Sequence, residues 1–399
     1  MDIDISINEF REFVCENPYE EIWRQLYYFT DNNSVSGKIR ERFKIKDGKY
    51  KNCSRNRAQK IAYSIIQADN YFKAARQVDV SVKPNLIYYG ISSLANAVIL
   101  YNNEGDFSDL REKEKEEHHG LDKSFNLNSA DSLQDILRSI SCTINKKPSS
   151  GRPYGHFKKF YKSIVHECVF VDRKINIVGE KSYLTDTSVD PNAEKVEIEG
   201  LADSKFDLLT MFEFLPDMVQ QLLDNEIVSN LCPGEAKWFV NESPQCQSNE
   251  AEISSQNNYQ TLNFAINRLS PEKKEYFERQ YLQNKAIQKI GEYPENLCFI
   301  YDSKHESENN YMPDITQDLF GKIYFIYNVE EYIQELANLY ICFFCTGMLC
   351  RYYPDYWMHW IEKNIGFKHL METLCSIAIR KFPNLILNQL TQCINHFHL

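Results

Sequence analysis

Two side chains capable of chemistry stand close together in a strongly charged part of the chain. Arg111 and His118 are separated by the six residues EKEKEE, and a second imidazole, His119, follows just before Gly120. An imidazole can transfer protons near neutral pH, and a guanidinium can stabilise the negative charge of a phosphate. Alternatively, the segment is a solvated helix in which Arg111 pairs with nearby glutamates and His119 caps a turn. Arg111, His118 and His119 are the candidate catalytic residues.

Four cysteines near the end of the chain raise the question of a metal site. Cys342 and Cys345 form a C-x-x-C pair inside an apolar stretch, and Cys350 and Cys375 follow. Structural zinc sites normally stand on turns and have a second ligand pair at similar spacing. Because these thiols follow an apolar helical pattern, buried core cysteines are the favoured interpretation. We therefore expect neither a metal nor a cofactor.

Aromatic residues are concentrated between residues 351 and 360. Tyr353, Trp357 and Trp360 have the ring area to stack bases, hold a small ligand or bind a partner. Alternatively, Pro354 ends a buried helix and the rings seal the core, because half-buried aromatic rings are common at helix junctions. Packing is the favoured interpretation, and the three residues are kept as binding candidates.

The stretch from residue 38 to residue 60, KIRERFKIKDGKYKNCSRNRAQK, carries a large positive excess. Its candidate contacts for a phosphate-bearing ligand lie at positions 43 to 46, which hold Phe43, Lys44, Ile45 and Lys46. The favoured alternative is a solvated loop followed by the start of a helix.

Length and charge limit the class of protein. The 399 residues allow two or three structural units of about 150 residues each. Lys and Arg number 45 against 56 Asp and Glu, a net charge of −11, so the chain as a whole is not suited to coat nucleic acid or an anionic membrane. Its start lacks the basic and apolar regions of a signal peptide. The longest apolar stretch, residues 339 to 350, is shorter than the roughly 18 residues that span a bilayer. We expect a cytoplasmic protein with reduced thiols.

Common catalytic motifs are absent from the sequence. It contains no GxxxxGK[ST] phosphate loop, no GxGxxG after a strand, no GxSxG elbow and no HExxH helix. These absences argue against the common nucleotide hydrolases, dinucleotide enzymes, serine hydrolases and zincins. Any chemistry must therefore use a site without a common motif.

Apolar periodicity predicts helices toward both ends of the chain. Helices are expected over residues 7–28 and 57–76, with a polar connecting stretch over 30–56. A further helix is expected from Pro84, because proline suits a first helical turn.

Short strands are expected in the middle of the chain, for example over residues 195–199, where Val196 and Ile198 alternate with charged residues. The Pro/Gly/Ser-rich segment KKPSSGRPYG precedes this part and marks a boundary. The predicted fold is α+β and predominantly helical. We divide it into a helical region (1–150), a mixed α+β region with short strands (151–320) and a helical region that packs on the N-terminal core (321–399).

Four segments with distinctive residues follow one another along the chain. They are KPNLIYYGISSLANAVIL at 83–100, HHGL at 118–121, GHFKKFY at 155–161 and CTGMLCRYYPDYW at 345–357. Their order resembles that of the YaaC-like bacterial proteins, and the resemblance covers roughly residues 60–165 and 205–365. It implies the fold, and it brings no established catalytic residues.

Within the first two segments, YYGISSLANAVIL followed by HHGLDKSF is similar to the paired helices of HEPN domains. Many of these domains belong to prokaryotic defence systems, and some are metal-independent ribonucleases that use an arginine and a histidine four to six residues beyond it. The likeness implies a HEPN-like N-terminal region in which His118 transfers the proton, Arg111 stabilises a pentacoordinate phosphate and the 2′-hydroxyl of RNA attacks. Glu112 stands where asparagine is frequent in that pattern.

Two functions of different classes follow from these patterns. The first is a cytosolic binding or scaffold subunit of a bacterial protein complex, with antiphage defence as one setting, which has a protein partner or forms a homo-oligomer. The second is a HEPN-like, metal-independent endoribonuclease that acts on RNA. A ligand-sensing module that uses the aromatic C-terminal segment is a third, lesser interpretation.

Overall fold

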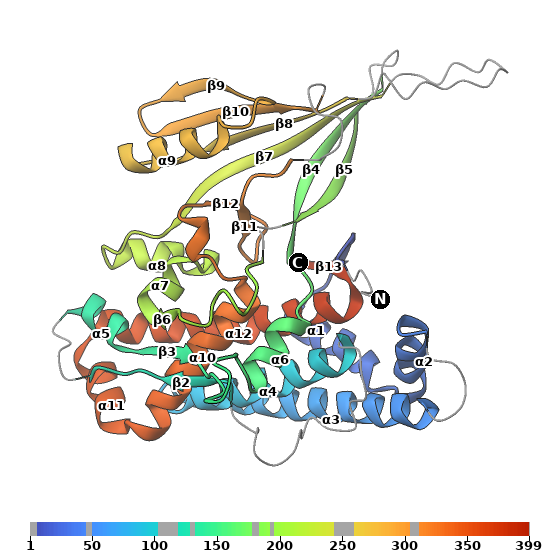
Figure 1. Cartoon of the computed structure of the whole chain (residues 1–399), viewed down its shortest axis with the longest axis vertical. Helices are drawn as coiled ribbons and strands as arrows, with labels where there is room; N and C mark the ends of the chain where they lie inside the picture. The colour runs from blue at the N-terminus through green and yellow to red at the C-terminus, as the bar shows by residue number, and fades with distance from the viewer. Residues whose placement is uncertain are drawn as a thin grey trace.

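The protein consists of a helical body and a twisted β-sheet that rises from it (Figure 1). The fold is α+β and predominantly helical, as predicted. None of the described helices is both long enough and apolar enough to cross a membrane. The computed structural model describes residues 6–44, 50–102, 119–127, 132–177, 183–191, 195–242, 259–303 and 311–398.

The helical body is organised around two buried helices, α4 and α10. Gly90 in α4 allows close packing, because a Cβ atom there would lie 2.7 Å from the ring of Phe72 on α3. α10 is buried from Glu335 to Leu349, and it contacts α4, α7 and α12, which explains why its sequence is apolar on every side. The helices are α1 (Pro18–Tyr27), α2 (Asn32–Arg42), α3 (Tyr50–Gln77), α4 (Lys83–Asn102), α5 (Leu133–Ser139), α6 (His156–Ser163), α7 (Leu208–Glu213), α8 (Val219–Asp224), α10 (Glu335–Tyr352), α11 (Pro354–Lys363) and α12 (Ile365–Thr391).

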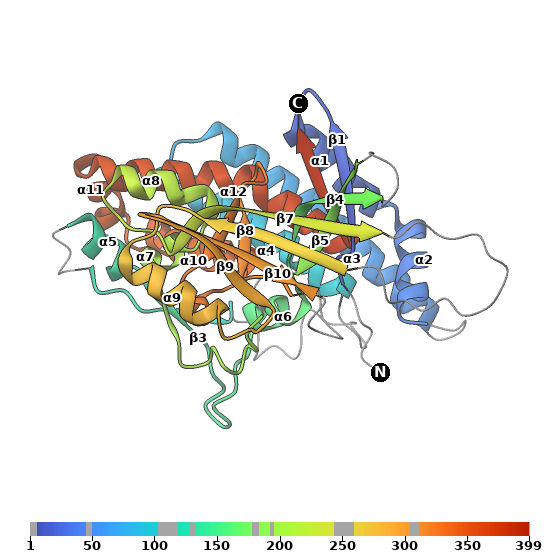
Figure 2. The same ribbon diagram turned by 90° about the horizontal axis from the view of Figure 1, so that it is seen from above.

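The large sheet has the strand order β11-β12-β7-β8-β10-β9, and β4 pairs with both β5 and β7. Its neighbours are antiparallel except for β4 and β7, which run parallel. α9 (Pro271–Tyr281) buries Phe277 and Tyr281 against this sheet, and the strands cross above the helices (Figure 2). The strands are β4 (Cys168–Ile177), β5 (Tyr183–Pro191), β7 (Leu231–Glu242), β8 (Tyr259–Ile266), β9 (Ile287–Tyr293), β10 (Asn296–Asp302), β11 (Ile315–Gln317) and β12 (Ile323–Ile326).

The two ends of the chain meet in a small parallel sheet. β1 (Glu9–Val14) pairs with β13 (Cys393–His398), and the rings of Phe13 and Phe397 stack with their centroids 4.7 Å apart. The prediction of one helix over 7–28 is therefore wrong for its first part. The pairing partner of β1 stands at the other end of the chain, so local periodicity carried no signal for it.

Two further expectations differ from the structure. The polar stretch 30–56 contains α2, which Asp31 caps by accepting the N–H groups of Asn33 and Ser34. Residues 195–199 do not form the predicted strand: 195–197 have no regular secondary structure, a turn begins at 198, and Ile198 is buried in the helical body. The remaining described strands form a sheet of β2 (Leu121–Lys123), β3 (Ser141–Ile144) and β6 (Lys205–Asp207).

Candidate functional site

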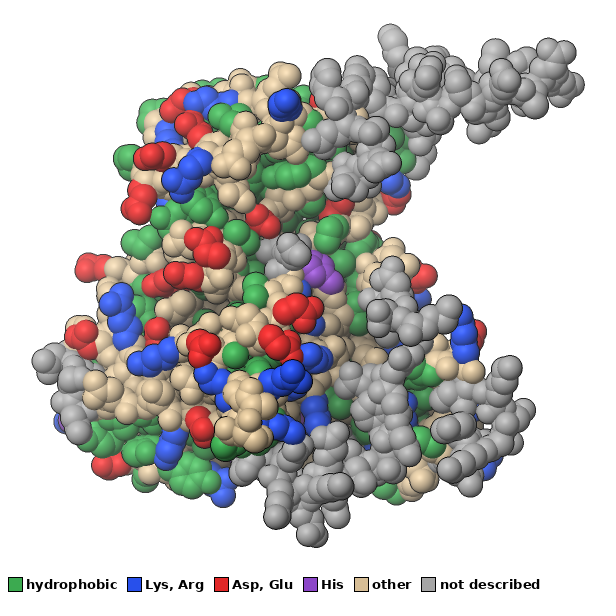
Figure 3. Space-filling model, in the orientation of Figure 1, with side chains coloured by type: hydrophobic (Ala, Val, Ile, Leu, Met, Phe, Trp, Pro, Cys, Tyr) green, Lys and Arg blue, Asp and Glu red, His purple; other side chains and the backbone are tan. Residues whose placement is uncertain are grey.

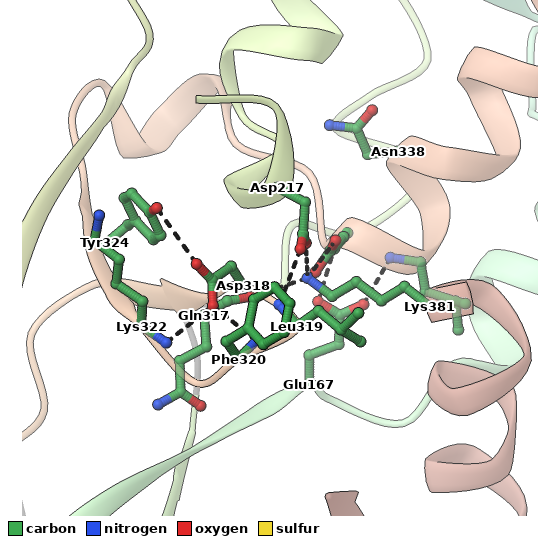
Figure 4. Close-up of polar contacts among 12 residues, drawn as sticks. Glu167, Asp217, Gln317, Asp318, Leu319, Phe320, Lys322, Tyr324, Asn338 and Lys381 are labelled. Atoms are coloured by element: carbon green, nitrogen blue, oxygen red, sulfur yellow. Dashed lines mark hydrogen bonds and ion pairs between the residues drawn. The ribbon is translucent and has the colours of Figure 1, made fainter. Parts of the chain in front are cut away.

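A buried lysine lies where the helical body meets the sheet. Lys381 of α12 places its ammonium 2.6 Å from Asp217 Oδ2 and 2.7 Å from Glu335 Oε1 (Figure 4). It also donates a hydrogen bond to the backbone carbonyl of Gln317, 3.0 Å away. Asp217 belongs to the short 3-10 helix η3 (Pro216–Met218), and Gln317 ends β11. One cation therefore joins four elements that are distant in the sequence.

A third carboxyl group, that of Glu167, completes the cluster. It accepts the backbone N–H groups of Glu335 at 2.9 Å and of Leu336 at 2.8 Å. These are donors of the first turn of α10, which have no partner within the helix. Glu167 comes directly before β4, so this contact attaches the start of α10 to the first strand of the sheet. We call Glu167, Asp217, Glu335 and Lys381 the charge cluster.

The electrostatics of the charge cluster identify Lys381 as a permanent cation. Burial raises the pKa of Glu335 to about 8 and also raises the pKa of Glu167. Burial disfavours the charged form of Lys381, but its acidic neighbours, above all the Asp217 carboxylate, outweigh this effect and raise its pKa above the ordinary value. At neutral pH Glu335 is mostly protonated, and Asp217 supplies the opposite charge. A lysine held in this way acts as a structural cation and not as a base.

A cleft with a volume of about 700 Å³ lies beside the charge cluster. In the space-filling view, the outline of the molecule narrows between the sheet and the helical body (Figure 3). The cleft is formed by α12, the start of α1, the end of α3, the turn between β11 and β12, and β13. Its lining residues are Asn17, Pro18, Tyr19, Ile22, Arg76, Leu319, Phe320, Ser376, Ile379, Arg380, Asn384, His396, Phe397 and His398.

The cleft is basic although the protein is acidic. Its described lining contains two arginines and two histidines but no carboxylate, in a chain with a net charge of −11. The guanidinium of Arg76 lies 4.2 Å from the ring centre of Tyr19, and that of Arg380 lies 5.8 Å from the ring centre of Phe320. Aromatic rings thus restrain both cations at the cleft. Burial lowers the pKa of His396, and neighbouring His398 lowers it further.

The candidate catalytic residues are only partly visible. Arg111 and His118 lie outside the described residues. His119 is described, and its Nδ1 atom lies 2.8 Å from the hydroxyl of Tyr88. Its ring also packs near Phe344, with centroids 6.0 Å apart.

A half-buried histidine that the sequence analysis did not single out lies in the same part of the body. His156 contacts the hydroxyl of Tyr340 at 2.8 Å and the amide oxygen of Asn96 at 2.9 Å. Burial lowers its pKa to about 4, so the ring is neutral at physiological pH. This histidine packs with its polar groups satisfied inside the core.

The aromatic candidates occupy different environments. Trp357 is fully buried and donates its indole N–H to the carbonyl of Ser81, and Trp360 is also buried. Tyr353 is half-buried, and its hydroxyl accepts a hydrogen bond from Lys123 at 2.7 Å. Of the three, Tyr353 is therefore the one that the structure places within reach of a binding partner.

The basic stretch turns several of its groups inward. Phe43 packs against the helical core under the guanidinium of Arg57, which is itself buried and donates to the carbonyl of Leu100. Burial lowers the pKa of Arg57 to about 10. Lys44 is exposed and has a left-handed backbone conformation. Ile45 and Lys46 lie outside the described residues.

The cysteines of the apolar helix are buried. Cys342, Cys345 and Cys375 have almost no exposed surface, and burial raises the pKa of the Cys342 and Cys375 thiols. Cys350 is half-buried and donates to the carbonyl of Ser81. In the described part of the chain, no three His, Cys, Asp or Glu side chains come together in a way that could hold a metal ion.

The sequence analysis did not identify the cleft or the charge cluster. A signal for Lys381 was present, because a lysine stands inside the apolar pattern of α12, next to Phe382. No sequence pattern indicates the cleft residues, because they come from five elements that are far apart in the sequence. Each of these elements has the pattern of an ordinary helix, turn or strand end.

The sequence model of a protein family described as YaaC-like protein matches residues 27–390. No curated protein and no solved structure matches the chain.

Two substitutions separate the roles of the charge cluster. Lys381→Met should lower the free energy of unfolding by about 3–5 kcal/mol, because it leaves the Asp217 carboxylate buried without its cation.

The Glu335→Gln variant tests whether the carboxyl group of Glu335 is protonated in the folded protein. Between pH 4.5 and pH 8 folded Glu335 holds a proton that the unfolded chain releases, so the wild type should lose stability as the pH rises through this window. The Glu335→Gln variant should lack this loss. Urea denaturation at several pH values measures both effects.

Lys368→Met is the matched control, because Lys368 lies on the same helix and its ion pair with Glu372, at 3.9 Å, is exposed. It should change the stability by less than about 1 kcal/mol. Equal effects of the two lysine substitutions would contradict the role assigned to the cluster, and so would parallel pH profiles of the wild type and the Glu335→Gln variant.

Proposed function

We propose that this chain, which belongs to the YaaC-like family, is a binding subunit of a protein complex and that its cleft recognises an anionic ligand. The observation that carries this proposal is the charge of the cleft: Arg76, Arg380, His396 and His398 line it, and no carboxylate does so among the described residues. The surrounding chain is acidic, so a local group of cations stands out against the average charge of the protein.

The chemistry of these side chains supports an anion as the ligand. A guanidinium presents several N–H donors in one plane and matches the oxygens of a carboxylate or phosphate. A concave site whose walls exclude water strengthens such contacts and concentrates ions of opposite charge. Lys381 stays bound to Asp217 beside the cleft, so the positive charge of the cleft comes from Arg76 and Arg380.

The edge of the sheet supports the role in a complex. β9 ends the strand order and has one described neighbour, β10. Its side chains Ile290 and Tyr293 are 59% and 62% exposed. An exposed edge strand with apolar side chains is a template for a strand from another protein. We assign this edge to a protein partner that adds a strand to β9.

Anion binding is tested with inorganic pyrophosphate as the probe. Pyrophosphate should raise the melting temperature of the wild type, and Arg76→Ala combined with Arg380→Ala should abolish this increase, because the variant lacks both guanidinium groups. Differential scanning fluorimetry over a range of pyrophosphate concentrations measures the effect. Arg279→Ala, an exposed arginine of α9 that does not line the cleft, is the control. An increase that persists in the double variant would refute the cleft as the site.

The partner surface is tested with the protein purified from its own host. The wild type should elute in a complex heavier than the 47.0 kDa chain, and Ile290→Lys with Tyr293→Lys should release the chain as a monomer, because two charges then face the added strand. Light scattering of the eluted peak gives the mass. Val228→Lys, another exposed apolar position (67%), should leave the complex intact. A wild type that elutes as a monomer would contradict this part of the proposal.

A specific surface favours the endoribonuclease as a second candidate function. Lys123 lies 4.5 Å from the ring centre of Tyr353, and Arg351 donates to the hydroxyl of Tyr89 at 2.6 Å. Exposed cations beside tyrosine rings are the side chains that hold single-stranded RNA. His119 belongs to the same part of the body, because it contacts Tyr88, the neighbour of Tyr89. The likeness to HEPN domains, with Arg111 and His118 at the centre, stays a prediction.

The test is RNA cleavage in EDTA by the protein purified together with its partners. If the second function holds, the wild type should cleave single-stranded RNA and His118→Ala should lose at least about 100-fold in rate, the loss typical of a removed proton-transfer group. The His156→Ala variant is the comparison, because His156 contacts Tyr340 and Asn96 and is not a candidate catalytic residue. It should retain the cleavage activity. RNA that stays intact with the wild type would leave the binding role as the function of this protein.

A further inference from the structure

We infer that the ligand of the cleft is a nucleotide, a molecule that joins a phosphate group to a planar base. This inference rests on the proposed anion-binding function and names the class of its ligand. Three observations carry it: the size of the cleft, the pairing of cations with aromatic rings along it, and an exposed phenylalanine that a rigid turn presents there.

The size of the cleft excludes a lone small anion as its intended occupant. Its volume of about 700 Å³ falls in the range of roughly 300–1,000 Å³ that is typical of sites for small organic molecules. The cavity directly at the charge cluster has only about 80 Å³. Phosphate alone would leave most of the larger cleft unfilled, whereas a nucleotide brings a sugar and a base to occupy it.

The lining provides surfaces for both ends of such a molecule. Arg76 and Arg380 supply guanidinium groups for a phosphate. Tyr19, Phe320 and Phe397 supply aromatic rings, on which a planar base can stack. Ile22 and Ile379 add apolar wall between the rings. A simple dicarboxylate would use the arginines and leave the exposed aromatic surface of the cleft uncovered.

The position of Phe320 is the most specific of the three observations. Its side chain is 76% exposed, at the tip of the turn between β11 and β12. The turn is held firmly, since the Asp318 carboxylate accepts the backbone N–H groups of Phe320 at 2.9 Å and of Lys322 at 3.0 Å (Figure 4). Gly321 has a φ of +80°, and a Cβ atom there would lie 2.5 Å from the ring of Phe170. A rigid turn thus exposes a large apolar ring at the cleft, where a base would cover it.

A polar side chain shared by the cleft and the small cavity fits the same ligand class. Asn384 lines both the cleft and the small cavity of the charge cluster. Its amide nitrogen donates to the carbonyl of Asn395, and its oxygen has no hydrogen-bond partner in the described structure. A buried acceptor without a partner costs free energy unless a donor reaches it. The N–H groups and hydroxyls of a nucleotide are such donors.

The experiment is isothermal titration calorimetry of the full chain with AMP, adenosine, ribose 5-phosphate and inorganic pyrophosphate. AMP should bind at least about tenfold more tightly than adenosine, which lacks the phosphate, and than ribose 5-phosphate, which lacks the base. GMP, CMP and UMP, titrated in the same way, rank the bases.

Two variants assign the ends of the ligand. Arg380→Ala should weaken AMP binding by about tenfold or more and leave adenosine unchanged, because only AMP carries the phosphate. Phe320→Ser should weaken AMP by a similar factor and leave pyrophosphate unchanged. Phe320 is largely exposed, so this substitution should not disturb the fold, and an unchanged melting temperature checks this. Arg279→Ala is the control for both variants.

The outcomes separate this inference from the function on which it rests. If pyrophosphate binds and AMP, GMP, CMP and UMP bind no more tightly than ribose 5-phosphate, the nucleotide is refuted while the anion-binding function stands. If no anion binds, both fail. AMP binding that Phe320→Ser and Arg380→Ala leave intact would place the nucleotide elsewhere and also overturn the inference.

Discussion

The ion pair between Lys381 and Asp217 is the contact on which the rest of the site depends. Lys381 and Arg380 are consecutive on α12, and the buried ammonium fixes the rotation of the helix that turns Arg380 to the cleft. The same Asp217 carboxylate accepts the backbone N–H of Leu319 at 3.0 Å, which positions the turn that carries Phe320. A single buried carboxylate therefore holds both the cationic and the aromatic side of the cleft.

Because this ion pair is buried, each charge needs a partner of opposite charge at close range. Removal from water destabilises a charge unless a partner compensates it. Loss of one partner therefore lowers the stability strongly, although the intact pair stabilises the fold no more than well-packed apolar residues would. The charge cluster meets this requirement by keeping one carboxyl group, that of Glu335, mostly protonated and by using Glu167 to cap α10. The result specifies how the sheet sits on the helical body, because each partner comes from a different element.

Patterns within one element were predictable from the sequence, and pairings between distant elements were not. The helices around α3 and α4 and the buried character of α10 followed from apolar spacing, since a helix records its environment every three or four residues. β1 was missed because its partner β13 lies at the other end of the chain. Residues 195–199 alternate like a strand, yet they form none, and Val196 and Ile198 both pack against the helical core. Tertiary contacts decided these segments.

The sequence by itself determined the fold class, the acidic net charge and membership of the YaaC-like family, because composition, periodicity and ordered motifs are properties of the linear chain. Only the tertiary structure decided where cations gather. Arg76 and Arg380 stand more than three hundred residues apart in the sequence, and each belongs to an element with an ordinary pattern. Their common basic cleft exists because folding excludes carboxylates from one small region of an acidic protein, and a net charge contains no information about that arrangement.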